Sequence, residues 1–345
     1  MFEPKYSITP EILNNLIKTA EAKALLDNAY LVPKWEVALR REALIKNAHA
    51  STAIEGNPLS LEQVSELAMG RDVMATRKAK AEVLNYLQVL EGLPELTDHG
   101  KVTEKVILKI HKLLTKDVLE NPADSGVYRN RQVVIGNRLT GVVTFRPPDT
   151  GDVPHLMKEF VKWLNGKDAD DTNPVLAAGI SHYEFVRIHP FIDGNGRTAR
   201  ALASLILYAR GFDTKRFFAL DDYYDSDRQT YYMALLSVDQ KTLDITEWLK
   251  YFTYGMAMQI GMVKEKVLSM SSDRKQKQLK GQIALTERQM KIVERMNNDG
   301  FITNKTMRDM FKLSDEAVLK ELKKLVSAGV IKLEGKGRNI RYVLA

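Results

Sequence analysis

The spacing of apolar and polar residues predicts helices along most of the chain. Pro10 stands at the first position of one helix, and Ser60 and Gln63 have the spacing of a capping box at the start of another. Pro174 opens a further helix, whose apolar positions recur at helical intervals toward residue 188. The apolar stretch over 201–207 is compatible with a buried helix. This part of the chain is therefore predicted to be mainly helical.

One pair of strands interrupts the helical pattern. β-branched residues are frequent in the segments 132–135 and 141–145, and a polar loop that contains Gly136 separates them. This arrangement is typical of a β-hairpin. The dipeptide Pro147-Pro148 follows and ends the second strand.

The last part of the chain predicts a different architecture. Thr286 begins a helix with a capping box, a second helical stretch covers 304–311, and Ser314 caps a third. Two short apolar strands at 330–333 and 340–343 enclose a glycine-containing turn. Three helices and a strand pair resemble a winged helix-turn-helix domain, and the polar residues 262–282 are expected to be the linker that precedes it.

Composition excludes several classes of protein. The 345 residues are 44% apolar and include no cysteine, which rules out disulfides, thiolate metal sites and a cysteine nucleophile. The longest apolar stretches, 201–209 and 251–263, are shorter than the ~18–20 residues that a membrane-spanning helix needs. The beginning of the chain has an acid and a proline where a secretory signal would be basic and apolar, so we expect a cytoplasmic protein.

The charge is distributed unevenly. Residues 262–345 contain 19 basic and 10 acidic side chains, whereas the whole chain has a net charge of +7. The rest is therefore slightly acidic, and the basic character belongs to the predicted C-terminal domain. Cations such as Lys336, Arg338 and Arg341 favour contacts with DNA phosphates. Asp315 and Glu316, at the start of the third helix, oppose that interpretation, so a role in dimerisation or target docking is an alternative.

One segment, 189–200, carries candidate chemistry. A turn with Gly194 and Gly196 leads into the apolar helix, and the free backbone N–H groups at a helix N-terminus form an anion site. Arg197 and Arg200 are three residues apart, so their side chains share a helix face and can reach terminal phosphates. These features indicate a phosphate ligand.

Two other side chains in the segment complete a reactive set. Asp193 is suited to Mg²⁺, which prefers one or two carboxylates together with phosphate oxygens and water. His189 is a titratable base close to the predicted phosphate site. A base, a metal carboxylate, a phosphate cradle and two arginines indicate phosphoryl or nucleotidyl transfer.

The segment matches the Fic motif, His-x-Phe-x-Asp/Glu-Gly-Asn-Gly-Arg-x-x-Arg, at every position. The chain resembles Fic-domain protein adenylyltransferases over roughly residues 40 to 255, including the stretch 125–129 and the hairpin. The resemblance implies a mainly α fold: a Fic helical core with a β-hairpin flap, followed here by the winged-helix (α/β) domain. It divides the chain into an N-terminal helical region (1–100), a catalytic core (101–261), the linker (262–282) and the C-terminal domain (283–345).

The resemblance also assigns roles to residues. His189 would accept the proton of a Ser, Thr or Tyr hydroxyl on a protein target, which attacks the α-phosphate of the substrate ATP, and Asp193 would bind Mg²⁺. Tyr231 is implied as a nucleobase contact, although it is equally suited to packing. The flap would pair with the target through Val133, Val143 and Thr144. The implied nucleotide-binding residues are Gly194, Asn195, Gly196, Arg197, Thr198, Ala199, Arg200 and Tyr231.

An earlier segment resembles the inhibitory motif of Fic proteins, Ser/Thr-x-x-x-Glu-Gly/Asn, with Ser51, Glu55 and Gly56. A glutamate paired with Arg200 would occupy the guanidinium that should hold the γ-phosphate. The alternative is that Glu55-Gly56 is an ordinary last helical turn with a capping glycine.

Several functions remain open at this stage. Gly196 replaces the lysine of the related Doc-type kinases, which favours adenylyl transfer, while phosphocholine transfer from a different donor and removal of AMP from targets are alternatives within the family. The alternative that is not an enzyme is a DNA-binding regulator that senses nucleotide without transferring it. The expected partners are ATP and a protein substrate, with DNA at residues 283–345 or a second copy of the chain as further candidates and no membrane.

Overall fold

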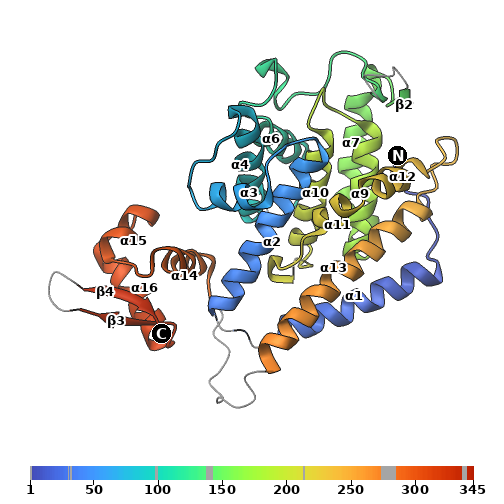
Figure 1. Ribbon diagram of the computed structural model, residues 1–345. Coiled ribbons are helices and arrows are strands. Elements are labelled where there is room, and N and C mark those ends of the chain that lie inside the picture. The colour runs from blue at the N-terminus through green and yellow to red at the C-terminus, as the bar shows by residue number, and fades with distance from the viewer. Residues whose placement is uncertain are drawn as a thin grey trace. The chain divides into compact units, whose positions relative to one another are not determined.

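The computed structural model describes residues 2–29, 31, 33–97, 100–136, 143–212, 214–272, 285–335 and 340–345, and most of them lie in helices (Figure 1). The chain forms two compact units. The first contains Met1–Asp27 and Ala43–Glu265, and the second contains Asn28–Glu42 and Lys266–Ala345. The mainly helical fold expected from the sequence is confirmed.

The first unit is built from helices with one short strand pair. Several predicted boundaries are correct, including the helix starts at Pro10 and Pro174 and the capping box at Ser60. The elements that lie wholly or mostly in it are α1 (Pro10–Asn28), α2 (Pro33–Ile54), α3 (Leu61–Ala68), α4 (Arg77–Glu91), α5 (Leu93–Leu96), α6 (Glu104–Leu114), η1 (Pro122–Asp124), β1 (Ile135–Gly136), β2 (Val143–Phe145), η2 (Thr150–Asp152), α7 (Val153–Leu164), α8 (Lys167–Asp170), α9 (Pro174–Ile188), α10 (Asn195–Ala209), η3 (Thr214–Arg216), α11 (Leu220–Ser226), α12 (Arg228–Leu236) and α13 (Thr246–Ser272).

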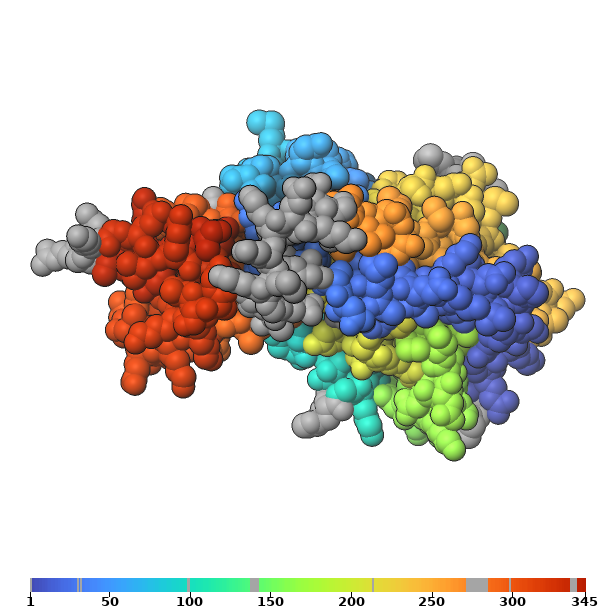
Figure 2. All heavy atoms as spheres, turned by 90° about the horizontal axis from the view of Figure 1, so that it is seen from below, coloured from blue at the N-terminus to red at the C-terminus, as the bar shows by residue number. Residues whose placement is uncertain are grey.

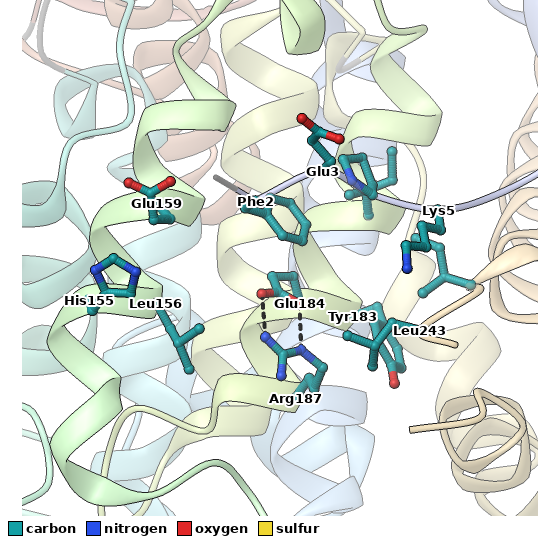
Figure 3. A pocket seen from close by; sticks show the side chains of 13 residues that line it. Phe2, Glu3, Lys5, His155, Leu156, Glu159, Tyr183, Glu184, Arg187 and Leu243 are labelled. Atoms are coloured by element: carbon teal, nitrogen blue, oxygen red, sulfur yellow. Dashed lines mark hydrogen bonds and ion pairs between the residues drawn. The ribbon is translucent and has the colours of Figure 1, made fainter. Parts of the chain in front are cut away.

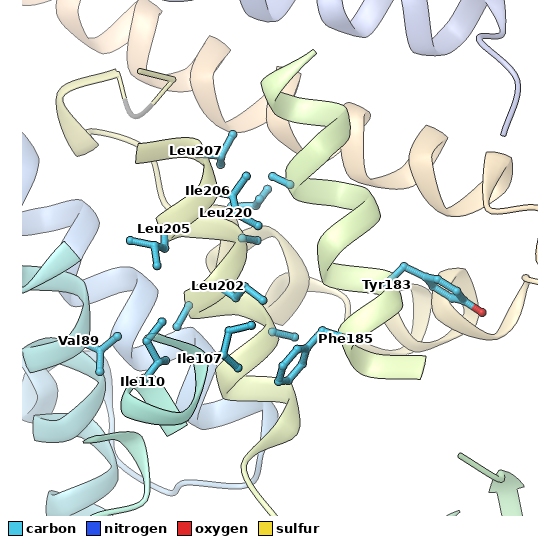
Figure 4. Close-up of a cluster of buried hydrophobic side chains, with 14 of the residues drawn as sticks. Val89, Ile107, Ile110, Tyr183, Phe185, Leu202, Leu205, Ile206, Leu207 and Leu220 are labelled. Carbon is cyan, nitrogen blue, oxygen red and sulfur yellow. The ribbon is translucent and has the colours of Figure 1, made fainter. Parts of the chain in front are cut away.

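Helix α10 lies at the centre of this unit. It packs against α9 on one side and against α4 and α6 on another (Figure 4). Its residues Leu202 and Leu205 are completely buried, as are Ile107 of α6 and Phe185 of α9. A helix that is buried nearly all round cannot shift without opening the core. The N-terminus of α10 is therefore held in a fixed place.

Helix α1 lies on the surface of the unit beside α13, where it is coloured blue in Figure 2. The side-chain amide of Asn15 donates to Thr253 Oγ1 at 3.2 Å. Across the core, the indole N–H of Trp248 donates to the carbonyl oxygen of Gly179 at 2.8 Å. These contacts fasten α13 to both α1 and α9.

The first strand of the pair begins later than predicted, at Ile135. Strands β1 and β2 are antiparallel, with Ile135 opposite Phe145 and Gly136 opposite Val143. Val133 precedes β1 and does not belong to it. The predicted positions 141 and 142 lie outside the described residues. The register shifts between Ile135 and Gly136, and such a bulge interrupts the ladder.

The second unit has its own apolar core and the predicted order of elements. Strands β3 and β4 pair antiparallel from Ile331 opposite Leu344 to Glu334 opposite Arg341. The first turn of α16 carries Asp315 and Glu316. Its assignment as a winged helix, and its binding of DNA, stay predictions. The elements are α14 (Glu287–Asp299), α15 (Asn304–Phe311), α16 (Asp315–Ser327), β3 (Ile331–Glu334) and β4 (Arg341–Leu344).

Helix α13 extends into the segment expected to be a linker. It continues to Ser272, and Val267 is completely buried, so an apolar position keeps this part of the helix packed. Residues 273–284, the rest of the expected linker and its end, lie outside the described residues. Among the helices that the structure describes, none is long and apolar enough to cross a membrane.

Candidate active site

The candidate loop begins where α9 ends. His189 is the C-cap of that helix and has a left-handed backbone, with φ 51° and ψ 59°. Its N–H donates to the carbonyl oxygen of Phe185 at 3.0 Å. A left-handed conformation is unfavourable for a residue with a side chain, so the surrounding contacts must stabilise it.

The ring of His189 is arranged as a proton acceptor. Its Nδ1 lies 3.2 Å from the carbonyl oxygen of Val186, which can only accept, so Nδ1 carries the proton and Nε2 has the lone pair. Burial lowers the pKa of His189 to about 4, against the opposing negative charges of Glu55 and Asp193. The imidazole is therefore neutral at physiological pH and its Nε2 can accept a proton.

Arg129, which the sequence analysis assigned no role, holds the turn after His189. Its Nε donates to the carbonyl oxygen of His189 at 2.9 Å, and its backbone N–H donates to that of Pro190 at 2.8 Å. A third contact runs from Nη1 to Thr150 Oγ1 at 2.6 Å. The resemblance had included residues 125–129, and the structure supplies the physical reason for a buried arginine there.

His111 is a second residue that the sequence analysis missed. It is completely buried in α6, and its ring stacks on that of Phe191 with centroids 3.6 Å apart. The N–H of Gly126 donates to Nδ1 at 2.9 Å, so Nε2 carries the proton and donates to the carbonyl oxygen of Asp193 at 2.9 Å. His111 thus fixes the backbone at Asp193. No local pattern marks it, because its partners lie 15 and 82 residues away in sequence.

Helix α10 begins as an anion site. Its N-cap, Gly194, has φ 79° and no side-chain cap, and the first intrahelical bond runs from Thr198 N–H to Gly194 O at 3.0 Å. The N–H groups of Asn195, Gly196 and Arg197 therefore precede the hydrogen-bond ladder. Positive potential at the helix N-terminus favours phosphate there.

The side chains of three predicted nucleotide-binding residues are buried, and two of them bond within the loop. The side chain of Asn195 is used within it: Oδ1 accepts from Phe191 N–H and Nδ2 donates to Phe191 O, both at 2.9 Å. The Thr198 hydroxyl donates to Gly194 O at 2.8 Å, and Ala199 is completely buried. What Asn195 can offer a phosphate is its backbone N–H.

Asp193 is suited to a magnesium ion. Its side chain is 55% exposed, and Oδ1 accepts from the N–H of Gly194. No cluster of three or more potential metal ligands occurs in the described part of the chain. A lone carboxylate beside a phosphate site fits Mg²⁺, because this ion usually keeps several waters and takes other ligands from substrate phosphates.

Arg197 is buried but loosely paired. Its side chain is 3% exposed, and Nη1 lies 3.5 Å from Glu82 Oε1 while Nη2 lies 3.8 Å from Asp193 Oδ1. Within the described residues its Nε and Nη1 have no hydrogen-bond partner. A buried guanidinium with unsatisfied donors is prepared to bind an anion such as phosphate.

Arg200 is bonded through Nε and Nη2 to the segment that resembles an inhibitory motif. Its Nε donates to Ser51 Oγ at 2.7 Å, and its Nη2 donates to Ser51 O at 2.8 Å and to Glu55 Oε1 at 2.7 Å. Burial would lower the pKa of Arg200, but the charge of Glu55 and other acidic neighbours raises it well above its ordinary value. The ion pair thus joins two residues 145 positions apart.

The end of α2 places Glu55 at this point. Gly56 has φ 91°, its N–H bonds to Ala53 O at 2.9 Å, and the N–H of Asn57 bonds to Thr52 O at 3.0 Å. This pair of bonds is the Schellman cap of a helix. The ordinary C-terminal turn and the pairing with Arg200 were alternatives in the sequence analysis, and both occur together.

Gly196 leaves room for the Glu55 carboxylate. A Cβ atom added at Gly196 would collide with Glu55 Oε1 and lie 3.1 Å from Arg200 Nη1. A side chain at this position would exclude Glu55 from its place on Arg200. Gly196 therefore permits the Glu55–Arg200 ion pair, in addition to the room for phosphates expected from the sequence.

Tyr231, a predicted nucleobase contact, belongs to the core. It is 1% exposed, its ring stacks on Tyr224, and its hydroxyl bonds to His182 Nε2 at 3.0 Å. The packing alternative therefore describes Tyr231 in this structure. Its neighbour Tyr232 points outward, with 45% exposure, and its hydroxyl donates to Ile54 O at 3.4 Å. Helix α12 turns the two tyrosines to different sides, which a dipeptide alone cannot reveal.

A cavity of about 250 Å³ lies on another face of α9 (Figure 3). Glu184 and Arg187 form a bidentate ion pair in its wall, with both N–O distances 2.7 Å. Phe2 and Lys5 of the N-terminal segment and His155 of α7 also line it. None of the residues 189–200 lines this cavity, so it is separate from the candidate active site.

Comparison with known proteins agrees with the geometry. Residues 101–207 match the sequence profile described as the Fic/DOC family. The chain is 29% identical over 278 residues to a protein adenylyltransferase Fic of Drosophila ananassae, covering 70% of this chain and 53% of that protein. The corresponding protein of Drosophila sechellia is 30% identical over 247 residues, covering 66% and 46%. The chain spans about half the length of the curated relatives it matches.

Solved structures show the same fold. A Fic family protein from Desulfovibrio desulfuricans has a TM-score of 0.67 and 25% identity, with 100% of this chain and 98% of that chain covered. A fragment of Fic-1 from C. elegans has a TM-score of 0.59 and 24% identity, with 76% and 73% covered. The first match extends over both units of the chain.

Proposed function

Because residues 101–207 match the sequence profile of the Fic/DOC family, we propose that this chain is an autoinhibited protein adenylyltransferase. It transfers AMP from ATP to a Ser, Thr or Tyr hydroxyl of a protein target and of itself. The relatives named protein adenylyltransferase Fic support the reaction class. The observation that carries the proposal is the folded loop, in which a neutral histidine caps the end of α9 and the anion site follows at the start of α10.

The chemistry divides among residues of the loop. His189 Nε2 takes the proton of the target hydroxyl, whose oxygen attacks the α-phosphate as pyrophosphate leaves. Backbone N–H groups of Asn195 and Gly196 stabilise negative charge that develops on phosphate oxygens. Arg197, with its unsatisfied donors, holds a terminal phosphate, and so does Arg200 once Glu55 has left it. His111 and Arg129 keep the loop in shape.

Asp193 would hold Mg²⁺. When bound, the ion would neutralise phosphate charge and orient the leaving group. The exposed carboxylate and its hydrogen bond to Gly194 N–H support this role.

Glu55 acts as the brake. It occupies Arg200 Nη2 and brings a negative charge to the place intended for the γ-phosphate. A charge-assisted hydrogen bond of this kind is worth ~1–3 kcal/mol, roughly a five- to 150-fold effect on productive ATP binding. Release of Glu55 is therefore the step at which activity would be regulated.

Product analysis tests the reaction class. The Glu55→Gly variant is incubated with ATP and Mg²⁺, and the released phosphates and modified peptides are identified by chromatography and mass spectrometry. Adenylyl transfer yields pyrophosphate and an AMP-bearing Ser, Thr or Tyr in equal amounts. ADP with phosphopeptides would instead establish a kinase, and neither set of products would point to a different donor or to nucleotide sensing.

A further inference from the structure

Asn57, the residue after the turn that carries Glu55, is buried and bonded through its whole amide. Nδ2 donates to Ala79 O at 3.0 Å and to Glu82 Oε2 at 2.7 Å, and Oδ1 accepts from Leu59 N–H at 3.1 Å. Asn57 is 9% exposed. An amide has two N–H donors, and both have partners here. The partners Ala79 and Glu82 belong to α4.

The backbone of Asn57 completes the cap of α2. Its N–H bonds to Thr52 O, and this bond together with that of Gly56 fixes the left-handed turn after Glu55. The same residue therefore closes the inhibitory turn through its backbone and fastens it to α4 through its side chain. Glu55, with a side chain 32% exposed, is positioned by this anchored turn.

The anchor also reaches the phosphate-binding arginines. Glu82 accepts from Asn57 with one oxygen and faces Arg197 Nη1 with the other at 3.5 Å. Arg200 is paired with Glu55. Asn57 and Glu82 therefore connect the inhibitory turn to Arg197 on the same helix, α10.

We propose that Asn57 is a positioning residue for the inhibitory carboxylate: its amide, bonded to Ala79 and Glu82, holds the turn so that Glu55 stays on Arg200. This inference rests on the proposed role of Glu55. Loss of the amide removes the bonds that fasten the turn to α4, so the Glu55–Arg200 pair opens more often.

Variants of Asn57 test the proposal in the full chain. Asn57→Ala in the otherwise wild-type protein should raise self-modification with ATP about fivefold or more. Asn57→Asp keeps the shape but loses both donors and sets a second carboxylate against Glu82, so it should act in the same direction. Asn57→Asp also keeps the proposal testable if Asn57→Ala does not fold.

A double-mutant comparison separates positioning from general stability. In the Glu55→Gly background, Asn57→Ala should cause no further increase, because no inhibitory carboxylate remains to be held. Asn85→Ala is the matched control. Asn85 lies in α4 and, like Asn57, is buried; its amide donates to Leu114 O at 3.2 Å and Lys116 O at 2.7 Å. It should lower the melting temperature without raising self-modification.

Hydrogen exchange gives a readout that does not depend on catalysis. The amides of Gly56 and Asn57, which are bonded to Ala53 O and Thr52 O, should exchange faster in Asn57→Ala than in wild type or Asn85→Ala. Unchanged exchange and wild-type activity in the Asn57 variants would overturn the proposal, as would an equal increase in the Glu55→Gly background. If the amides exchange faster in Asn57→Ala but Glu55→Gly does not modify itself, the positioning role of Asn57 would stand and the proposed function would be refuted.

Discussion

Arg200 is paired with one carboxylate, Glu55, and lies in the electrostatic field of a second, Asp221, which is less able to leave. Glu55 is partly exposed and comes from the end of α2, whereas Asp221 is buried in α11 and bonded to Tyr86 Oη at 2.6 Å. Burial raises the pKa of Asp221 to about 6, while the charge of Arg200 opposes the rise. At neutral pH Asp221 is therefore charged, so Arg200 keeps a counter-charge in the core after Glu55 leaves. Removing Glu55 frees donors without leaving a bare buried cation.

A substitution of His111 tests the support beneath the loop. His111→Phe keeps an aromatic ring against Phe191 but loses the bonds to Gly126 N–H and Asp193 O. In the Glu55→Gly background we expect kcat for self-modification to fall about tenfold or more, because small displacements of reacting groups are costly. Steady-state kinetics measure this, with thermal melting as the check on folding. A folded variant with unchanged kcat would show that the loop does not need His111.

The residues that sequence analysis could and could not identify differ in one respect. His189, Asp193, Arg197 and Arg200 lie in one continuous motif, and Glu55 lies in another, so their types and spacing were informative. His111, Arg129 and Glu82 act through partners far away in sequence. Their roles depend on how α4, α6 and the 125–129 segment pack around the loop, which no local pattern encodes.

At the scale of elements, two helix ends and one helix start form the site. The C-terminal cap of α9 presents His189, the N-terminus of α10 presents the anion site, and the cap of α2 presents Glu55. Helix ends were predictable from proline, glycine and capping residues. The hairpin was predicted as two strands of four and five residues, and the described strands are β1 with two and β2 with three. Backbone pairing across a bulge is difficult to infer from side-chain pattern alone.

The flap gives a prediction at this scale. We expect Val143→Pro, in β2 opposite Gly136, to reduce modification of a protein target about tenfold and to leave ATP binding nearly unchanged. Proline lacks the main-chain donor through which an added target strand can pair. Target kinetics and calorimetric ATP titration of the same variant measure both effects.

The exposed neighbour Thr144 provides the control for that substitution. Thr144→Val changes the side chain and keeps the backbone donor, so target modification should stay close to that of the parent protein. Unchanged target kinetics in Val143→Pro would refute the placement of the flap.

At the scale of the whole molecule, buried histidines make folding stability sensitive to acid. Burial lowers the pKa of His111 to about 4 and that of His182 to about 3. An unfolded chain protonates histidine near ~6.5, so between that pH and about 4 the unfolded state binds more protons. The free energy of unfolding therefore falls as pH falls through this window. Asp221, with its raised pKa, acts in the opposite direction between about 6 and its ordinary value.

His111 and His182, together with His189, whose pKa burial also lowers to about 4, outweigh Asp221, so we expect a lower melting temperature at pH 5 than at pH 7.5. Each buried histidine contributes about 1–2 kcal/mol to the difference. His182→Gln should reduce the difference, since glutamine stays neutral and can still bond to Tyr231 Oη. Thermal unfolding at the two pH values measures the effect. A melting temperature that is equal or higher at pH 5 would contradict this assignment.

The curated relatives and the solved structure match the chain over different lengths. The Drosophila relatives are about twice as long as the matched region, and the likeness to the Desulfovibrio protein extends over both units. The C-terminal unit therefore recurs with a Fic domain in a solved structure. Its basic composition does not by itself identify a partner, because the first turn of α16 is acidic.

The most direct test of the central claim uses ATP labelled either at the α- or at the γ-phosphate. Wild type, Glu55→Gly and Glu55→Gly/His189→Ala are incubated with each label and Mg²⁺, and only covalent label on protein is counted. We expect strong α-label in Glu55→Gly, little in wild type, none in the double variant and no γ-label in any. Equal α-label in wild type and Glu55→Gly would contradict the brake, and covalent γ-label alone would contradict adenylyl transfer.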